Sequence, residues 1–134
     1  NVMVSAGGRL LMTFCDGGFQ YLLAGVRGSV GLKAGRYMWE VKIVENLNPY
    51  EGSAQRNVRA SLPKQLVRVG LSTSGGDAIL DASENKVYFD NEGFFVHQKR
   101  QSRLSEPFKR DHVIGVVVNL EPKSPNANTI SLFC

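Results

Sequence analysis

The strongest constraint on the fold comes from residues 34–45, AGRYMWEVKIVE, in which large apolar and charged side chains alternate. Successive side chains along a β-strand point to opposite faces, so a period of two sorts residues by face. One face carries Tyr37, Trp39, Val41 and Ile43. The other face carries Met38, Glu40, Lys42 and Val44. The pattern predicts a strand with one buried face, and it assigns the mainly aromatic and branched face to the structural core.

Short apolar runs separated by turn residues continue the β pattern along the chain. We expect a hairpin in residues 8–26, where two apolar runs flank Asp-Gly-Gly. Later strands are expected in LVRVGLST, KVYFD, GFFVH, HVIGVVVNLE and TISLFC. The stretch NLNPYEGSAQRNVRASLPKQ predicts a long surface loop, because prolines and polar residues interrupt it. No sustained i, i+3, i+4, i+7 apolar stripe occurs, so the sequence predicts an all-β protein without long helices.

Length and composition are those of one soluble globular domain. The chain has 134 residues, of which 43% are hydrophobic and 21% charged. No apolar run reaches the ~18 residues of a membrane span, so we expect no membrane partner. Two cysteines, Cys15 and Cys134, are too few for a disulfide scaffold. We expect buried free thiols and an intracellular compartment, with a bridge between the terminal strands as the alternative.

Charge is distributed unevenly along the chain. Residues 46–68 and residues 97–112 each carry a net charge of +3, whereas residues 69–96 carry −4. Basic segments attract nucleic acid or acidic peptides, although loops are also charged simply because they are solvated. The candidate contacts to RNA or to an acidic partner are Arg56, Arg59, Lys64, Lys99, Arg100, Arg103, Lys109 and Arg110.

Motifs for catalysis and cofactor binding are missing from the sequence. The two histidines, His97 and His112, have no second His or Cys at metal-ligand spacing. There is no Gly-x-Ser-x-Gly elbow, Walker loop or Gly-x-Gly-x-x-Gly fingerprint. We interpret Asp111 and His112 as a solvated loop pair rather than a catalytic base with its orienting group. The sequence therefore predicts a non-catalytic protein with no metal, no cofactor and no small-molecule substrate.

Four segments in order resemble the SPRY domain family. They are GVRGSVGLKAGRYMWEVKIVE, LVRVGLST, FKRDHVIGVVVNLEP and NTISLFC. The matching positions are Arg27, Gly31, Leu32, Gly35, Tyr37, Trp39, Glu40, Val41, Arg68, Gly70, Ser72, Asp111, Val113, Ile114, Gly115, Asn119, Leu120, Ile130 and Leu132. A long insertion before LVRVGLST makes the chain most similar, within the family, to the SPRY segments of proteins like heterogeneous nuclear ribonucleoprotein U.

This resemblance implies a bent sandwich of two antiparallel sheets, with loops at one end that often grip a short extended peptide in relatives. It places Trp39 at a core position. We treat residues 1–134 as a single SPRY-like domain, and because the family normally has at least one further strand, we expect a fragment of a larger protein. The subtype resemblance implies an RNA-associated parent protein, nuclear or cytoplasmic, with the nucleus favoured.

Two functions are consistent with the residues. The first is a non-catalytic module that binds a partner peptide or protein through its loops, because arginine forks bind carboxylates and exposed rings bury area. Its candidate contacts are Arg27, Tyr50, Arg68, Tyr88 and Phe94. The alternative for these residues is structural: the two strand aromatics face the core, and Arg27 and Arg68 pair with Glu40 or another strand carboxylate.

The second function is direct RNA or phosphate binding through the basic loops 46–68 and 97–112. Proteins that bind unpaired bases stack them on aromatic rings placed between the basic residues. The segment 97–112 has only Phe108 for this purpose. We therefore prefer the protein-interaction module and keep RNA binding as the alternative.

Overall fold

A computed structural model describes residues 1–15, 17–46 and 65–134. Its strands are β1 (Val2–Ser5), β2 (Leu10–Thr13), β3 (Arg36–Lys42), β4 (Arg68–Ser72), β5 (Lys86–Asp90), β6 (Phe94–His97), β7 (Arg100–Arg103), β8 (Val113–Asn119) and β9 (Thr129–Phe133). Within these ranges the helical segments are two single 3-10 turns, η1 (Ala6–Gly8) and η2 (Phe19–Tyr21). Every strand pairing is antiparallel. For the described residues, the predicted class, all-β with antiparallel sheets and no long helices, is confirmed.

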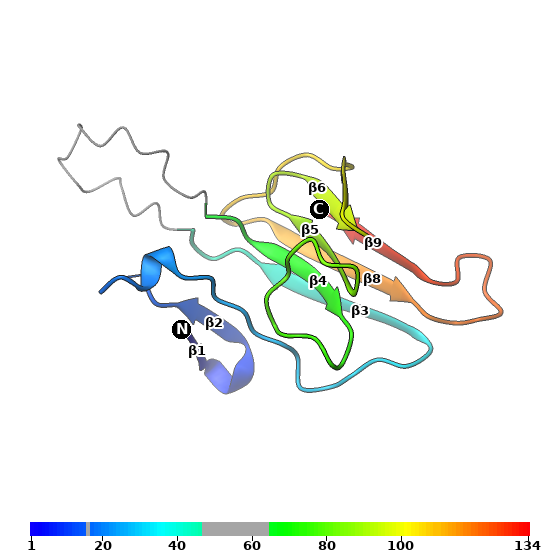
Figure 1. Cartoon of the computed structure of the whole chain (residues 1–134), viewed down its shortest axis with the longest axis horizontal. Coiled ribbons are helices and arrows are strands. Elements are labelled where there is room, and N and C mark those ends of the chain that lie inside the picture. Colours follow the sequence, from blue (N-terminus) through cyan, green and yellow to red (C-terminus); the bar gives the residue numbers. More distant parts are fainter. Residues whose placement is uncertain (16, 47–64) are drawn as a thin grey trace.

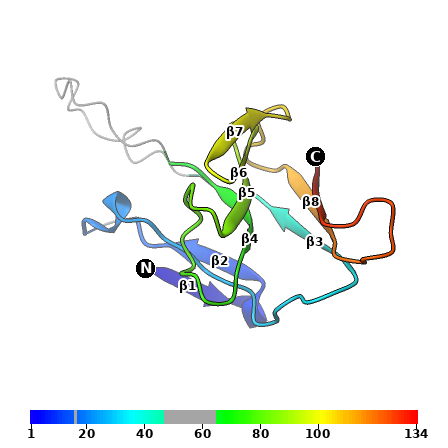
Figure 2. The same cartoon turned by 45° about the vertical axis from the view of Figure 1, so that its right-hand side comes forward.

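The strands form a three-stranded sheet in the order β3-β8-β9, a four-stranded sheet in the order β4-β5-β6-β7, and a separate β1-β2 hairpin (Figure 1). The alternating strand β3 pairs along its whole length with β8, the most apolar segment of the chain. In Figure 2, β7 lies at the upper margin of the molecule and the β1-β2 hairpin lies at the opposite, lower side.

The buried face of the three-stranded sheet is the face that the alternation predicts. Trp39 lies opposite Val116, and Val41 lies opposite Ile114, so these side chains share one face. Val116 and Ile114 are both 0% exposed. The face of central β8 that carries Ile114 and Val116 is therefore covered, as expected for a strand paired on both sides with its apolar face packed.

One hydrophobic cluster connects the two larger sheets. Ile43 and Ile114 belong to the three-stranded side, and they pack with Phe108, which follows β7. Val67, immediately before β4, and Leu132 in β9 pack against the same cluster. The bent two-sheet sandwich that the SPRY resemblance implies stays a prediction.

The assignment of Tyr37 to the core is wrong. Its side chain is 41% exposed, whereas Ile43 on the same predicted face is buried. Tyr37 stands near the start of β3, and its ring atoms lie 3.6 Å from where a Cβ on Gly35 would stand, at the margin of the sheet. Trp39 and Val41 are half-buried, so burial increases along the strand toward Ile43.

The N-terminal hairpin turns earlier than the sequence predicts. Its turn contains Ala6, Gly7 and Gly8, all with positive φ, and β2 returns antiparallel to β1. Gly17 and Gly18 also have positive φ, but they lead into η2 rather than into a strand. Either of two glycine-containing segments could form the turn of this hairpin, and the sequence pattern alone does not show which one does.

Both cysteines are free and exposed, so the expectation of buried thiols is wrong. Cys15 follows β2 in the small hairpin, and Cys134 follows β9. Neither position is covered by a second layer of described residues. The sulfur of Cys134 lies 3.5 Å from Nδ1 of His112.

Candidate partner-binding surface

Arg27 holds the loop between β4 and β5. Its guanidinium donates to the Ser72 hydroxyl at 2.8 Å and to the carbonyl oxygens of Gly76 and Asp77 at 2.7 Å each. A weaker contact reaches the Ser74 carbonyl at 3.4 Å. Arg27 therefore does not pair with a strand carboxylate. Its Nη2 group is held by the loop, so Arg27 is less suited as a fork for a partner than an arginine without such bonds.

Arg68 and Tyr88 are brought together, but they face inward. The Arg68 guanidinium lies over the Tyr88 ring at 5.1 Å from its centroid, and Nη1 donates to the Leu80 carbonyl at 2.6 Å. Tyr88 is only 4% exposed. Tyr88 therefore faces the core, as the structural alternative has it, whereas Arg68 bonds a backbone carbonyl rather than a strand carboxylate.

The acidic middle segment is also used internally. Lys86 is almost fully buried, and its Nζ bridges Asp77 at 2.9 Å and Asp81 at 3.1 Å. The hydrogen bond from the Ser83 hydroxyl, followed by that from Lys86, lowers the pKa of Asp81 to about 2. The hydrogen bond from Lys86 also lowers the pKa of Asp77. Both carboxylates therefore serve to anchor the β4–β5 loop over Lys86.

Three candidate cations, Lys99, Arg100 and Arg103, lie on the hairpin of β6 and β7, residues 94–103, which we call the basic hairpin. All four residues of β7 are exposed. Lys99 pairs with Glu84 at 3.0 Å, but both side chains are mostly exposed, so this contact contributes little stability. Within the described residues, Arg100 and Arg103 have no ion pair or side-chain hydrogen bond.

The turn of the basic hairpin has an unusual composition. Gln98 and Lys99 have φ of 49° and 64°. Two consecutive left-handed residues are the geometry of a tight hairpin turn that normally selects Asn or Gly, because a β-carbon is crowded there. Strain of this kind is often kept where function requires a fixed geometry.

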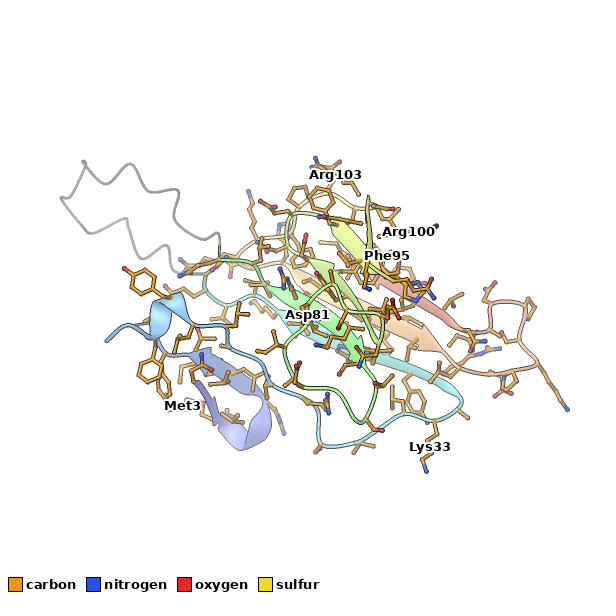
Figure 3. The ribbon with its side chains drawn as sticks, in the orientation of Figure 1. Met3, Lys33, Asp81, Phe95, Arg100 and Arg103 are labelled. Atoms are coloured by element: carbon orange, nitrogen blue, oxygen red, sulfur yellow. The ribbon has the colours of Figure 1, made fainter. Side chains whose placement is uncertain are left out.

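Ring side chains of β5 and β6 lie next to one another in a row that ends near the turn of the basic hairpin. The ring centroids of Phe89 and Phe95 are 5.0 Å apart, and those of Phe95 and His97 are 6.3 Å apart. Figure 3 shows Phe95 and Arg100 close together in that view. Phe94, another candidate contact, is half-buried and lies opposite Arg103. Exposed arginines thus border partly covered rings.

Of the other candidate basic residues, the structure describes some and not others. Lys109 and Arg110 are exposed, and Arg110 has a loose contact with Asp111 at 3.7 Å. Phe108 is 1% exposed, so the single aromatic residue that could stack on a base from segment 97–112 is in the core. Tyr50, Arg56, Arg59 and Lys64 lie outside the described residues.

Strand β7 is an element of the candidate surface that the sequence pattern does not predict. Its four residues, RQSR, are all polar, so they give no apolar alternation. Arg100 and Arg103 are candidate contacts in the sequence as well, but as loop residues, whereas the structure places them in a strand. The only sequence signal was their position directly after the GFFVH strand, with two residues between them for a tight turn.

Comparisons with known proteins do not assign the chain. No protein-family model matches it. No curated protein is significantly similar to it. In the part of the chain that the structure describes, no group of three or more His, Cys, Asp or Glu side chains is placed to hold a metal ion. None of the described helical turns is long and apolar enough to cross a membrane.

Proposed function

We propose that the chain is a non-catalytic protein-interaction module that binds an acidic segment of a partner protein through the basic hairpin. One observation carries the proposal: Arg100 and Arg103 are exposed and have no ionic partner among the described residues. Among the other described arginines proposed as contacts, Arg27 and Arg68 are occupied by loop backbone, and Arg110 lies beside Asp111. We therefore assign the proposed binding surface to residues 94–103 and not to Arg27 and Arg68.

Two further points support this choice. The strained turn at Gln98 and Lys99 projects Arg100 from a defined geometry rather than from a flexible loop. The resemblance to SPRY domains, whose members often grip an extended peptide, favours a peptide over a small molecule. The subtype resemblance is also the basis for proposing a larger, RNA-associated parent protein in the nucleus or cytoplasm.

RNA binding is the competing proposal, because exposed arginines also attract phosphate. Burial of Phe108 weakens it, since unpaired bases are normally stacked on exposed rings. An acidic peptide needs no such ring. It needs only carboxylates that accept from the arginine forks.

The test is a titration of the protein with two fluorescein-labelled probes, an extended peptide with two glutamates three positions apart and a single-stranded oligouridine. We expect the peptide to bind with a Kd on the order of 10 µM at about 0.05 M salt and several-fold more weakly at about 0.15 M. The oligouridine should bind more weakly than the peptide at both salt concentrations. Absence of peptide binding at low salt, or tighter binding of the oligouridine that displaces the peptide, would contradict the proposal.

A further inference from the structure

The free edge of β7 is the feature from which we draw a further inference. β7 is the last strand of the order β4-β5-β6-β7, so among the described strands only one of its edges is paired. An unpaired edge presents backbone donors and acceptors on which another extended chain can pair. In Figure 2 this strand lies at the outer margin of the molecule.

The backbone groups that face outward can be identified. In an antiparallel pair, hydrogen-bonded and non-hydrogen-bonded residues alternate. Leu104 donates to the Gly93 carbonyl at 3.0 Å, in register with the β6–β7 ladder, so Ser102 and Arg100 also face β6. The N–H and C=O of Gln101 and Arg103 therefore point away from β6. Within the described residues, no hydrogen bond reaches these groups.

We propose that the acidic partner segment adds to this edge as a fifth antiparallel strand, an inference that rests on the function proposed above. Strand addition gains affinity from main-chain hydrogen bonds and specificity from side chains on alternate faces. Arg100 and Arg103 are an odd number of residues apart, so they project from opposite faces of the sheet. Acidic residues three positions apart on the added strand would lie directly opposite them, one on each face.

Charge argues against a second copy of this chain as the occupant. If two β7 edges pair antiparallel through the outward groups of Gln101 and Arg103, either Arg103 lies directly opposite Arg103 of the other copy, or Gln101 lies opposite Arg103 and the two Arg103 side chains are diagonal neighbours on one face. Like charges directly opposite across a sheet are destabilising, and charged edge residues are a common protection against self-pairing. Arg100 and Arg103 instead favour an added strand that carries carboxylates opposite them.

The inference is tested by blocking single hydrogen bonds without changing any charge. In the acidic peptide, the residue opposite Gln101 directs its N–H toward β7, whereas the residue opposite Ser102 directs its N–H away. We expect N-methylation of the first residue to weaken binding at least about tenfold, through a lost hydrogen bond and a steric clash. N-methylation of the second residue should change the Kd less than about threefold.

A protein variant checks the same contact from the other side. Gln101→Pro removes the outward N–H without removing a β6–β7 hydrogen bond, and proline is accepted on edge strands in that orientation. We expect it to weaken peptide binding, whereas Gln101→Ala, which keeps the N–H, should bind as the parent does. Circular dichroism reports whether Gln101→Pro folds, and if it does not, the methylated peptides decide the matter with the unmodified protein.

The outcomes separate this inference from the function on which it rests. If both methylated peptides bind like the unmodified one, while charge reversal at Arg100 and Arg103 abolishes binding, strand addition is wrong and the basic hairpin is still the binding surface. If the unmodified peptide does not bind at all, both proposals fail. Formation of a dimer in the absence of peptide, detected by size-exclusion chromatography and abolished by Gln101→Pro, would identify a second copy as the occupant and overturn the inference.

Discussion

Replacement of Phe108 by alanine should lower the free energy of unfolding by about 3–5 kcal/mol, the usual cost of deleting a buried phenylalanine side chain. The ring is 1% exposed and packs with Ile43 and Ile114 at the point where the two larger sheets meet. Its loss removes apolar burial and leaves a cavity between elements that backbone hydrogen bonds hold in place. Urea unfolding followed by fluorescence measures the change.

Phe108→Leu is the matched control, because leucine keeps most of the buried volume. We expect it to cost about 1 kcal/mol. A loss below about 1 kcal/mol for Phe108→Ala would show that Phe108 is not a core residue in solution. A stable Phe108→Ala protein that has lost oligouridine binding would instead support base stacking by this ring.

Charge reversal of the basic hairpin, Arg100→Glu with Arg103→Glu, should weaken binding of the acidic peptide by about a hundredfold. An exposed ion pair contributes about 0.2–1 kcal/mol, and reversal replaces that attraction by a repulsion of similar size. Each substitution therefore changes binding by about 0.4–2 kcal/mol, and we expect the upper part of this range, roughly tenfold, for arginines that each face a carboxylate. Fold stability should be almost unchanged, because both side chains are exposed and lack ionic partners in the described structure. Fluorescence anisotropy with the labelled peptide measures the effect.

The control for this variant has the same change in net charge at distant positions. Lys33 and Lys123 are both exposed, and Figure 3 shows Lys33 well away from Arg100 and Arg103. We expect Lys33→Glu with Lys123→Glu to weaken peptide binding less than about threefold. Equal losses in the two double variants would mean that the peptide responds to net charge rather than to the basic hairpin.

The fold was predictable wherever burial imposed a pattern. β3 alternates because one of its faces is packed, and the KVYFD segment forms β5 at the residues expected. The polar strand β7 was not predictable in this way, because an edge strand with solvent on its outer side needs no apolar face. Tyr37 shows a second limit. Alternation predicts the face of the strand on which a residue lies, but not whether the opposing layer extends far enough along the strand to cover it.

The sequence predicts which types of residue form the candidate site, but not which of these residues are already bonded within the protein. The sequence identifies Arg27, Arg68, Arg100 and Arg103 alike as cations near strand ends. Which of them is free depends on contacts with distant backbone: Arg27 with the loop after β4, and Arg68 with Leu80. Such side-chain to backbone contacts have no sequence signature, because any residue can supply the carbonyl oxygen.

The most direct test of the account is amide hydrogen exchange of β7 with and without the acidic peptide, followed residue by residue by NMR. In the free protein, the amides of Gln101 and Arg103 should exchange rapidly, and those of Arg100 and Ser102, which face β6, should be protected. Addition of the peptide should slow exchange at Gln101 and Arg103 by at least about tenfold. Unchanged exchange at these two amides, with slowing centred on other segments, would contradict binding at the basic hairpin.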